Sequence, residues 1–307
     1  MSTQKFATQA LHAGHNVSEN GGTRAVPIYQ STAYVFNSSD HAANLFALAE
    51  PGNIYTRINN PTNDILEQRL AALEGGIAAV VTASGTAAIA TSLLTLLRAG
   101  DHIVASSSLY GGTYNLLSVT LPRHGITTTF VDPSNPENFQ KAAQENTRAF
   151  FIESLGNPKL DVLDIEAISK VSKAYKVPLI VDNTVATPYL LNPIAYGANI
   201  VIQSLTKYIN GNGTALGGAI IDAGTFDWGS GKFPEFTEPS AGYHGLIYNE
   251  VIGAASFIAK VRIEGLRDYG AALSPFNAFQ IIQGLETLEV RIQKHSENAL
   301  ELAQWLQ

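Results

Sequence analysis

Short apolar runs alternate with longer amphipathic segments along most of this chain. A run that is apolar throughout is typical of a strand buried on both faces, so we predict that these runs form one mainly parallel sheet. The predicted strands are residues 79–81, 102–105, 126–131, 149–152, 178–181, 199–202 and 218–221.

Helical periodicity separates these runs. Ile65, Leu66, Leu70 and Leu73 fall on one face of a helix that Gly75 ends, and similar patterns cover residues 86–98 and 164–175. Strands and helices that alternate in this way predict an α/β fold. We expect a doubly wound, mainly parallel seven-stranded sheet with helices on both faces.

The two ends of the chain follow other patterns. Residues 1–61 lack periodicity but contain Tyr29, Tyr34 and Tyr55, so we predict an arm that packs on another surface, followed by a large domain over residues 62–271. Residues 272–307 read as the start of a C-terminal domain that is mostly missing. There we expect apolar side chains with nothing to pack against, namely Leu285, Leu288, Ile292, Leu300, Leu302 and Leu306.

The composition limits the classes of partner and location that the chain can have. Only 15% of the 307 residues are charged and 45% are hydrophobic, against roughly 25% charged in typical domains, so we expect partner subunits to cover part of the surface and predict a homo-oligomer. The net charge of -7 and the lack of any Lys/Arg cluster argue against nucleic acid. No signal or membrane-spanning run is present, which predicts a cytoplasmic protein that does not contact membranes.

The chain has no cysteine, and its seven histidines form no HxH or HxxxH pair. Thiolate chemistry is thereby excluded, and we expect no metal site.

Lys207 is the first candidate for chemistry. It follows the predicted strand 199–202 and precedes a glycine-rich run, where its amine could be fixed and deprotonated as a nucleophile. The alternative is an ordinary solvated lysine at a strand end.

Further polar residues follow other predicted strands. Ligands bind at the carboxyl ends of the strands in open α/β sheets. Ser84, Gly85 and Thr86 open a helix after the first run, where a phosphate could bind, although an ordinary capped helix is equally compatible. The motif is not GxGxxG, which disfavours a dinucleotide.

Asp182 ends an apolar run and needs a cationic or N–H partner, unless it is a helix N-cap or a structural ion pair. Ser204 and Thr206 place two hydroxyls beside Lys207. Tyr110 could stack on a planar ligand, and Asn157 could be a polar ligand or a turn residue. An amine, a carboxylate, a phosphate cradle, hydroxyls and an aromatic ring together match pyridoxal phosphate (PLP).

Three motifs strengthen this interpretation: residues 55–62, residues 181–184, and residues 204–209 with the glycines that continue to Gly218. They resemble the Cys/Met-metabolism family of PLP-dependent enzymes over nearly the whole chain. This resemblance implies the fold of aspartate aminotransferase and a tetramer built of dimers.

The resemblance also implies roles for single residues. Lys207 would form the Schiff base and take the substrate's α-proton, Asp182 would pair with the pyridine nitrogen, and Tyr110 would stack on the ring and assist proton transfer. Asn157 would bind the phenolic oxygen. The phosphate would be held by a set comprising Ser84, Gly85, Thr86, Ser204 and Thr206, with Tyr55 and Arg57 from the neighbouring subunit.

Within the family, the long connection over residues 224–273 and the sequence Gly-Leu-Glu-Thr-Leu at 284–288 resemble the O-acetylhomoserine sulfhydrylases. The expected reaction is γ-replacement, in which O-acetyl-L-homoserine and sulfide or a thiol give homocysteine or methionine and acetate. The alternatives are elimination of the methionine or cystathionine γ-lyase type, or a fragment that binds the cofactor without efficient turnover. The arginine that binds the substrate carboxylate in the family has no equivalent here, because Arg262, Arg267 and Arg291 lie too early in the chain.

Overall fold

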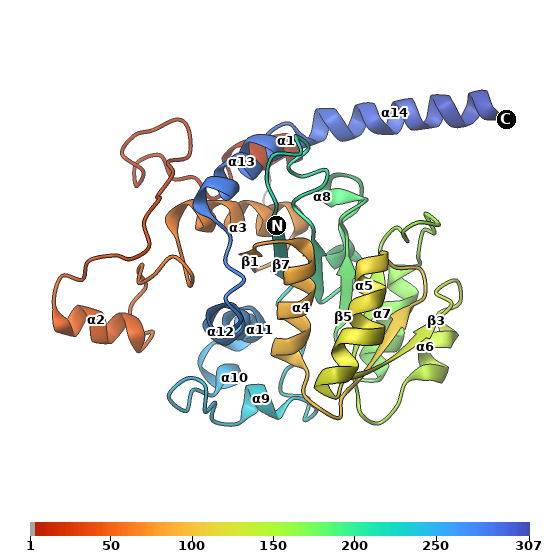
Figure 1. Cartoon of the computed structure of the whole chain (residues 1–307), viewed down its shortest axis with the longest axis horizontal. Coiled ribbons are helices and arrows are strands. Elements are labelled where there is room, and N and C mark those ends of the chain that lie inside the picture. The colour runs from red at the N-terminus through yellow and green to blue at the C-terminus, as the bar shows by residue number, and fades with distance from the viewer. Residues whose placement is uncertain (1–3) are drawn as a thin grey trace.

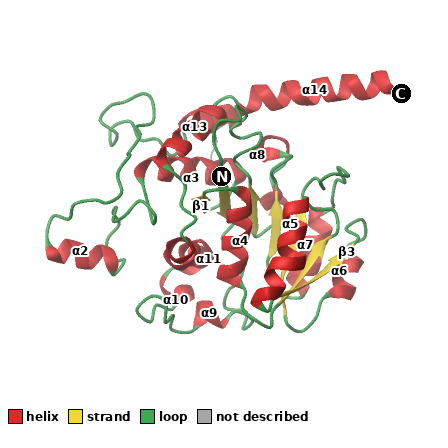
Figure 2. Ribbon diagram, viewed as in Figure 1, coloured by secondary structure: helices red, strands yellow, loops and turns green. Residues whose placement is uncertain are grey.

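A seven-stranded sheet lies at the centre of the computed structural model, which describes residues 4–307, so the first three residues of the predicted arm lie outside it (Figures 1 and 2). Each predicted run overlaps one strand, with bounds that differ by one or two residues at some ends. The strands are β1 (Ala78–Thr82), β2 (His102–Ser106), β3 (Thr127–Val131), β4 (Thr147–Glu153), β5 (Leu179–Asp182), β6 (Ile200–Gln203) and β7 (Gly218–Asp222).

The strand order is β1-β7-β6-β5-β4-β2-β3. Only β7 is antiparallel to its neighbours, and the other pairs are parallel. Glu153 of β4 is paired with Asp182 of β5, and Asp182 is paired with Ile202 of β6. The carboxyl ends of these strands therefore meet at one edge, and the prediction of a mainly parallel α/β sheet is confirmed.

Helices cover both faces of the sheet (Figure 2). They are α1 (Phe6–His12), α2 (Ser39–Phe46), α3 (Pro61–Glu74), α4 (Gly85–Leu96), α5 (Gly111–Asn115), α6 (Glu137–Ala142), α7 (Ile165–Ala174), α8 (Thr187–Leu190), α9 (Pro234–Thr237), α10 (Tyr248–Val251), α11 (Ser256–Lys260), α12 (Arg267–Tyr269), α13 (Pro275–Leu285) and α14 (Leu288–Leu306). One buried cluster joins α3, α7 and α13 to the sheet, and a second joins α4 and α11 to its other face. Apolar side chains on both faces explain why most strand sequences are apolar, whereas β3, at the edge of the sheet, begins with three threonines that are exposed or partly exposed.

The connection after β7 folds on itself around aromatic side chains. Trp228, Phe233 and Phe236 are buried, and the ring of Trp228 stacks on that of Phe257 in α11 at 5.4 Å between centroids. This segment is therefore a small aromatic core packed beside α4.

The last helical pattern is divided into two helices, α13 and α14. The expectation that Leu285, Leu288 and Ile292 would be exposed is wrong, because α13 packs on α3, and Leu285 at the end of α13 and Leu288 and Ile292 at the start of α14 join the same buried cluster. Further along α14, the side chains of Leu300, Leu302 and Leu306 are exposed, which confirms the expectation for these three residues. This part of α14 extends beyond the body of the protein (Figure 1).

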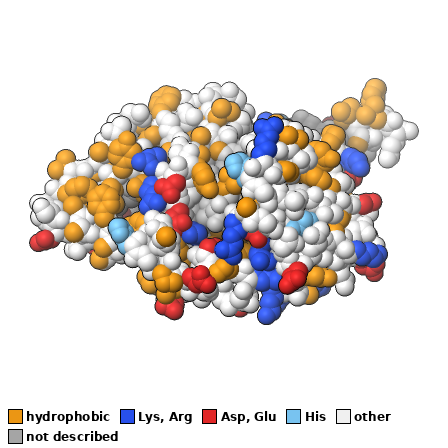
Figure 3. Space-filling model, turned by 60° about the horizontal axis from the view of Figure 1, so that its bottom comes forward, with side chains coloured by type: hydrophobic (Ala, Val, Ile, Leu, Met, Phe, Trp, Pro, Cys, Tyr) orange, Lys and Arg blue, Asp and Glu red, His pale blue; other side chains and the backbone are white. Residues whose placement is uncertain are grey.

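The N-terminal arm carries exposed apolar side chains. Val35 is 96% exposed, and Phe46 and Leu48 are also exposed. In the space-filling view, hydrophobic side chains gather over the arm at the left (Figure 3). Apolar side chains that gather in one patch, unlike single apolar residues scattered over a surface, are typical of an interaction surface.

Candidate active site

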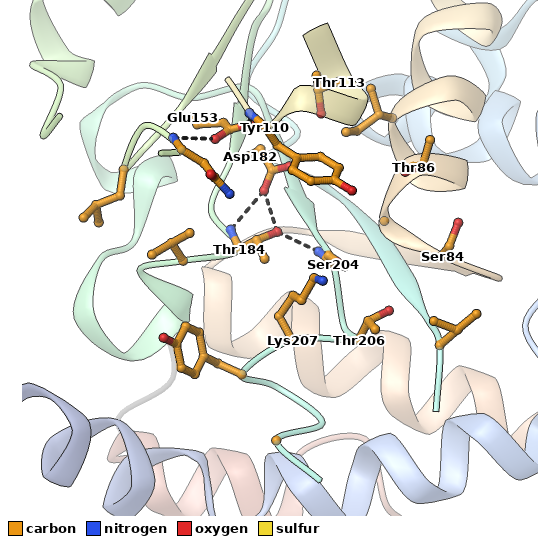
Figure 4. A pocket seen from close by; sticks show the side chains of 18 of the residues that line it. Ser84, Thr86, Tyr110, Thr113, Glu153, Asp182, Thr184, Ser204, Thr206 and Lys207 are labelled. Carbon is orange, nitrogen blue, oxygen red and sulfur yellow. Dashed lines mark hydrogen bonds between the residues drawn. The ribbon is translucent and has the colours of Figure 1, made fainter. Parts of the chain in front are cut away.

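A cavity of about 730 Å³ opens at the carboxyl edge of the sheet. It brings together residues that are far apart in the sequence. The predicted site residues that line it are Ser84, Gly85, Thr86, Tyr110, Asn157, Asp182, Ser204, Thr206 and Lys207 (Figure 4). Their convergence follows from the parallel strands, because each residue comes directly after a strand end or at the start of the following helix.

The start of α4 forms one wall. The Ser84 side chain caps this helix by accepting a hydrogen bond from the Ala87 N–H, which leaves the N–H groups of Gly85 and Thr86 without intrahelical partners. A Cβ at Gly85 would lie only 2.5 Å from the Cβ of Ser204. Glycine therefore allows α4 and the end of β6 to approach closely enough to surround one anion.

Ser204 and Thr206 follow β6 at the same wall. The Thr206 hydroxyl donates to the Gly217 carbonyl at 3.1 Å and accepts from the Gly217 N–H at the same distance. This hydroxyl therefore fixes the loop that returns to β7, while Ser204 faces Gly85.

Lys207 lies in the turn after β6, and its backbone N–H donates to the Ser204 carbonyl at 3.2 Å. Its side chain lines the cavity, and its Nζ has no hydrogen bond or ion pair within residues 4–307. The amine is thus free to react with a bound carbonyl group.

Asp182 faces the cavity from the end of β5. Its Oδ1 accepts hydrogen bonds from the Thr184 hydroxyl at 2.6 Å and the Thr184 N–H at 3.0 Å. Burial raises the pKa of Asp182, and these two hydrogen bonds oppose that rise. A cationic ring nitrogen beside this carboxyl would keep it ionised.

Glu153 ends β4 next to Asp182, and it was not among the predicted site residues. Its carboxyl accepts the backbone N–H of Tyr110 at 2.7 Å and that of Asn157 at 3.2 Å. Burial first, and then the charge of Asp182, raise the pKa of Glu153 to about 8. The signal that could have found Glu153 is the one that singled out Asp182, a carboxylate at the end of an apolar strand.

The Tyr110 ring is half-exposed and projects over the cavity (Figure 4). Through Glu153, the loop that carries Tyr110 and the loop that carries Asn157 are attached to the same strand end. A planar ligand between this ring and the sheet edge would have an aromatic stacking partner.

Arg291 and Tyr208 line the opposite side of the cavity. The Arg291 guanidinium donates to the backbone carbonyls of Tyr208, Ile209 and Gly284. It therefore holds α14 against the turn that follows Lys207. From the sequence, Arg291 is considered only as a ligand of the substrate carboxylate. Its hydrogen bonds to these backbone carbonyls are not predicted, because the sequence carries no local signal for them.

Tyr55 and Arg57 do not line the cavity of their own chain. The Arg57 guanidinium lies over the Tyr55 ring, 5.4 Å from its centroid, and donates to the Arg267 carbonyl. Their expected contact with a neighbouring subunit stays a prediction.

The polar groups that line the cavity fit PLP. An unpaired amine suits the carbonyl of the cofactor, the Asp182 carboxyl suits the ring nitrogen, and the glycine-lined start of α4 suits the phosphate. Within residues 4–307, no group of three or more His, Asp or Glu side chains is placed to hold a metal ion. None of the helices in that range is long and apolar enough to cross a membrane.

Comparison with known proteins agrees with this chemistry. Residues 7–307 match the family described as Cys/Met metabolism PLP-dependent enzyme. The chain is 58% identical to the O-acetyl-L-homoserine sulfhydrylase of Leptospira meyeri, a match that covers 99% of this chain and 70% of that protein. It is 50% identical to the homocysteine synthase of Schizosaccharomyces pombe, over 99% of this chain and 72% of the other.

A solved structure is also similar. It is the crystal structure of a Campylobacter jejuni protein assigned as O-acetylhomoserine (thiol)-lyase, which contains N'-pyridoxyl-lysine-5'-monophosphate. The TM-score is 0.95 with 44% sequence identity, and the match covers 99% of this chain and 76% of the other.

Proposed function

The chain belongs to the Cys/Met metabolism family of PLP-dependent enzymes, and from this premise we propose that it catalyses γ-replacement on O-acetyl-L-homoserine. Sulfide or a thiol would displace acetate and give homocysteine or methionine. One observation carries the proposal: the unpaired Lys207 amine shares a cavity with Asp182 and the start of α4, in a chain 58% identical to an O-acetyl-L-homoserine sulfhydrylase.

Bound PLP supplies a carbonyl that condenses with amines and a ring that accepts electrons from the substrate's α-carbon. Lys207 would hold the cofactor through Nζ, and its amine, once free, would take the α-proton of the substrate. Asp182 would keep the proton on the ring nitrogen. Gly85, Thr86 and Ser204 would hold the phosphate, and Asn157 would bind the phenolic oxygen.

The bonds of the reaction balance without a redox partner. Protons leave the α-carbon and the β-carbon, the γ-carbon–oxygen bond breaks and acetate departs with the electron pair. Sulfide then forms the new carbon–sulfur bond, and the two protons return. Tyr110 stacks on the cofactor ring and assists proton transfer at the leaving acetate.

Borohydride reduction of the purified chain with PLP tests the cofactor site. We expect a phosphopyridoxyl adduct at Lys207 after peptide mapping. Lys207→Arg retains the charge but stays protonated, so it should form no adduct and lose about 10²- to 10⁴-fold in activity. Lys170→Arg, at an exposed lysine paired with Glu166, is the matched control. An adduct at another lysine would contradict the assignment.

Product analysis tests the reaction. With O-acetyl-L-homoserine, acetate release should require sulfide or a thiol and should match homocysteine or methionine formation. Accumulation of 2-oxobutyrate without a thiol would show elimination of the γ-lyase type instead. PLP binding without either product would show a chain that holds the cofactor but does not turn over.

The proposal includes an assembly. We propose a homo-oligomer, a dimer of dimers, in which the arm over residues 1–61 reaches the cofactor domain of its neighbour over residues 62–271, and in which residues 272–307 begin a separate domain. The exposed Val35, Phe46 and Leu48 support a surface of this kind. Analytical ultracentrifugation tests the assembly, and cell fractionation tests the cytoplasmic location that the proposal also includes.

A further inference from the structure

The two oxygens of Asp182 have different surroundings. Oδ1 accepts both hydrogen bonds from Thr184, one from the hydroxyl at 2.6 Å and one from the backbone N–H at 3.0 Å. Oδ2 has no hydrogen-bond partner within residues 4–307. The carboxyl therefore has one oxygen fixed by the protein and one available to a ligand in the cavity (Figure 4).

The direction of the Thr184 hydroxyl is determined by Ser204. The Ser204 N–H donates to the Thr184 Oγ1 at 2.8 Å, so the hydroxyl oxygen is an acceptor on that side and its proton points to Asp182. The 2.6 Å separation between Oγ1 and Oδ1 falls in the range of O–H donors bound to an ionised acceptor. Thr184 thus links the end of β5 to the residue that follows β6.

Asp182 needs this support because no cation pairs with it among the described residues. Its partner across β4 and β5 is Glu153, another carboxyl and not a cation. Burial favours the neutral acid and raises the pKa of Asp182. The two Thr184 donors act in the opposite direction and lower the pKa of Asp182.

We propose that Thr184 is a positioning residue for the ring nitrogen of PLP. By holding Oδ1 with two donors, it favours the ionised form of Asp182 and leaves Oδ2 to the nitrogen, which would then stay protonated. Thr184 acts through Asp182 and need not touch the substrate. This inference rests on the proposed function, because it assigns Asp182 to the pyridine nitrogen.

The variant pair Thr184→Val and Thr184→Ser separates the hydroxyl from the shape of the side chain. Valine is similar in shape and lacks the O–H, whereas serine retains it. Thr95→Val is the matched control, because the Thr95 hydroxyl donates only to the Thr91 carbonyl of its own helix and Thr95 does not line the cavity. Thermal unfolding without PLP establishes that each variant is folded.

Two measurements on the holoenzyme report on the proposal. The first is the ¹⁵N chemical shift of bound, ring-labelled PLP, which we expect to move towards neutral pyridine in Thr184→Val and to stay pyridinium-like in Thr184→Ser and Thr95→Val. The second is the Kd for PLP, which should rise about 10- to 100-fold in Thr184→Val, since hydrogen bonds to charged groups have that effect.

Thr184→Val also leaves the Ser204 N–H without its acceptor. A change in the Kd for PLP alone therefore does not test the role of Thr184. An unchanged ¹⁵N shift in Thr184→Val would overturn the inference, even if PLP binds more weakly. Thr184→Val combined with Asp182→Asn should have little more effect than Asp182→Asn alone, and full additivity would also overturn it.

If the unmodified chain forms no PLP adduct, the proposed function fails as well. If the adduct forms at Lys207 but the shift is insensitive to Thr184, only this inference fails.

Discussion

Gly112 occupies a position beside Tyr110 where a larger residue would displace the ring. A Cβ at Gly112 would lie 2.5 Å from the Cε1 of Tyr110, whereas a Cβ at the adjacent Gly111 would meet nothing within 4 Å. Both glycines belong to α5. One of two neighbouring glycines thus controls where the Tyr110 ring lies.

Gly112→Ala should therefore move the Tyr110 ring away from the cofactor without unfolding the protein. Aromatic stacking contributes about 0.5–1.5 kcal/mol, so we expect the Kd for PLP to rise about 2- to 10-fold. Fluorescence titration with PLP measures this change. Gly111→Ala gains the same helix propensity and should bind PLP as the unmodified chain does. Equal Kd values for the two variants would show that the ring does not contribute to binding.

At the scale of whole elements, Glu74 connects three parts of the site edge. It ends α3, is fully buried, and accepts hydrogen bonds from the Gln203 amide at 2.6 Å and the Asn183 amide at 3.2 Å. Gln203 precedes Ser204, and Asn183 follows Asp182. Because Glu74 has amide partners and no cation, burial raises its pKa to about 7, against the two opposing hydrogen bonds.

This raised pKa predicts how stability depends on pH. The folded protein binds the Glu74 proton more tightly than the unfolded chain, in which the pKa of this carboxyl is near its ordinary value of 4.5. The free energy of unfolding should therefore fall as the pH rises from about 4.5 to 7, and the loss should persist above that range.

Glu74→Gln should abolish this part of the pH dependence, because the amide does not ionise. Relative to the unmodified protein, the variant should gain on the order of 3 kcal/mol as the pH rises through that range. Urea unfolding at several pH values measures the difference. Glu166→Gln, which alters only the exposed Glu166–Lys170 pair, is the control. Parallel stability curves for Glu74→Gln and the unmodified protein would refute the prediction.

At the scale of the whole molecule, the arm and the cavity are separated within one chain. Arg57 contacts Arg267 and Tyr55, and neither Arg57 nor Tyr55 lines the cavity that holds Lys207. A site assembled from two chains would explain this separation.

Subunit mixing tests a shared site. Arg57→Ala and Lys207→Ala should each reduce activity by at least about 10-fold, because the first would remove the proposed charged contact to the phosphate and the second removes the amine proposed to take the α-proton. After the two variants are mixed and reassociated, some sites should contain an intact Lys207 from one chain and an intact Arg57 from the other. We expect activity to return in proportion to hybrid formation.

Lys207→Ala mixed with Asp182→Asn is the matched control, because both residues line the cavity of one chain and no hybrid can restore a complete site. No recovery with Arg57→Ala would mean that Arg57 serves its own chain, whereas recovery in this control would mean that mixing restores activity without a shared Arg57.

The sequence alone determined the elements and much of the chemistry. Mostly apolar runs predicted all seven strands, because a strand covered on both faces has few polar positions. Strand-end positions predicted Lys207, Asp182 and the Ser84–Thr86 turn, since the carboxyl ends of parallel strands share an edge. The motifs around Tyr55, Asp182 and Lys207 indicated the family that the comparison then established.

Only the tertiary structure decided which residues contact one another. The strand order places Glu153 beside Asp182, and this makes their charges interact although the residues are far apart in the chain. The packing of α13 on α3 buries Leu285, which periodicity cannot distinguish from exposure. The direction of the Thr184 hydroxyl depends on the N–H of Ser204, which follows another strand, β6. Periodicity and polarity are local properties of a sequence, whereas burial, charge coupling and hydrogen-bond direction depend on neighbours that only the folded chain supplies.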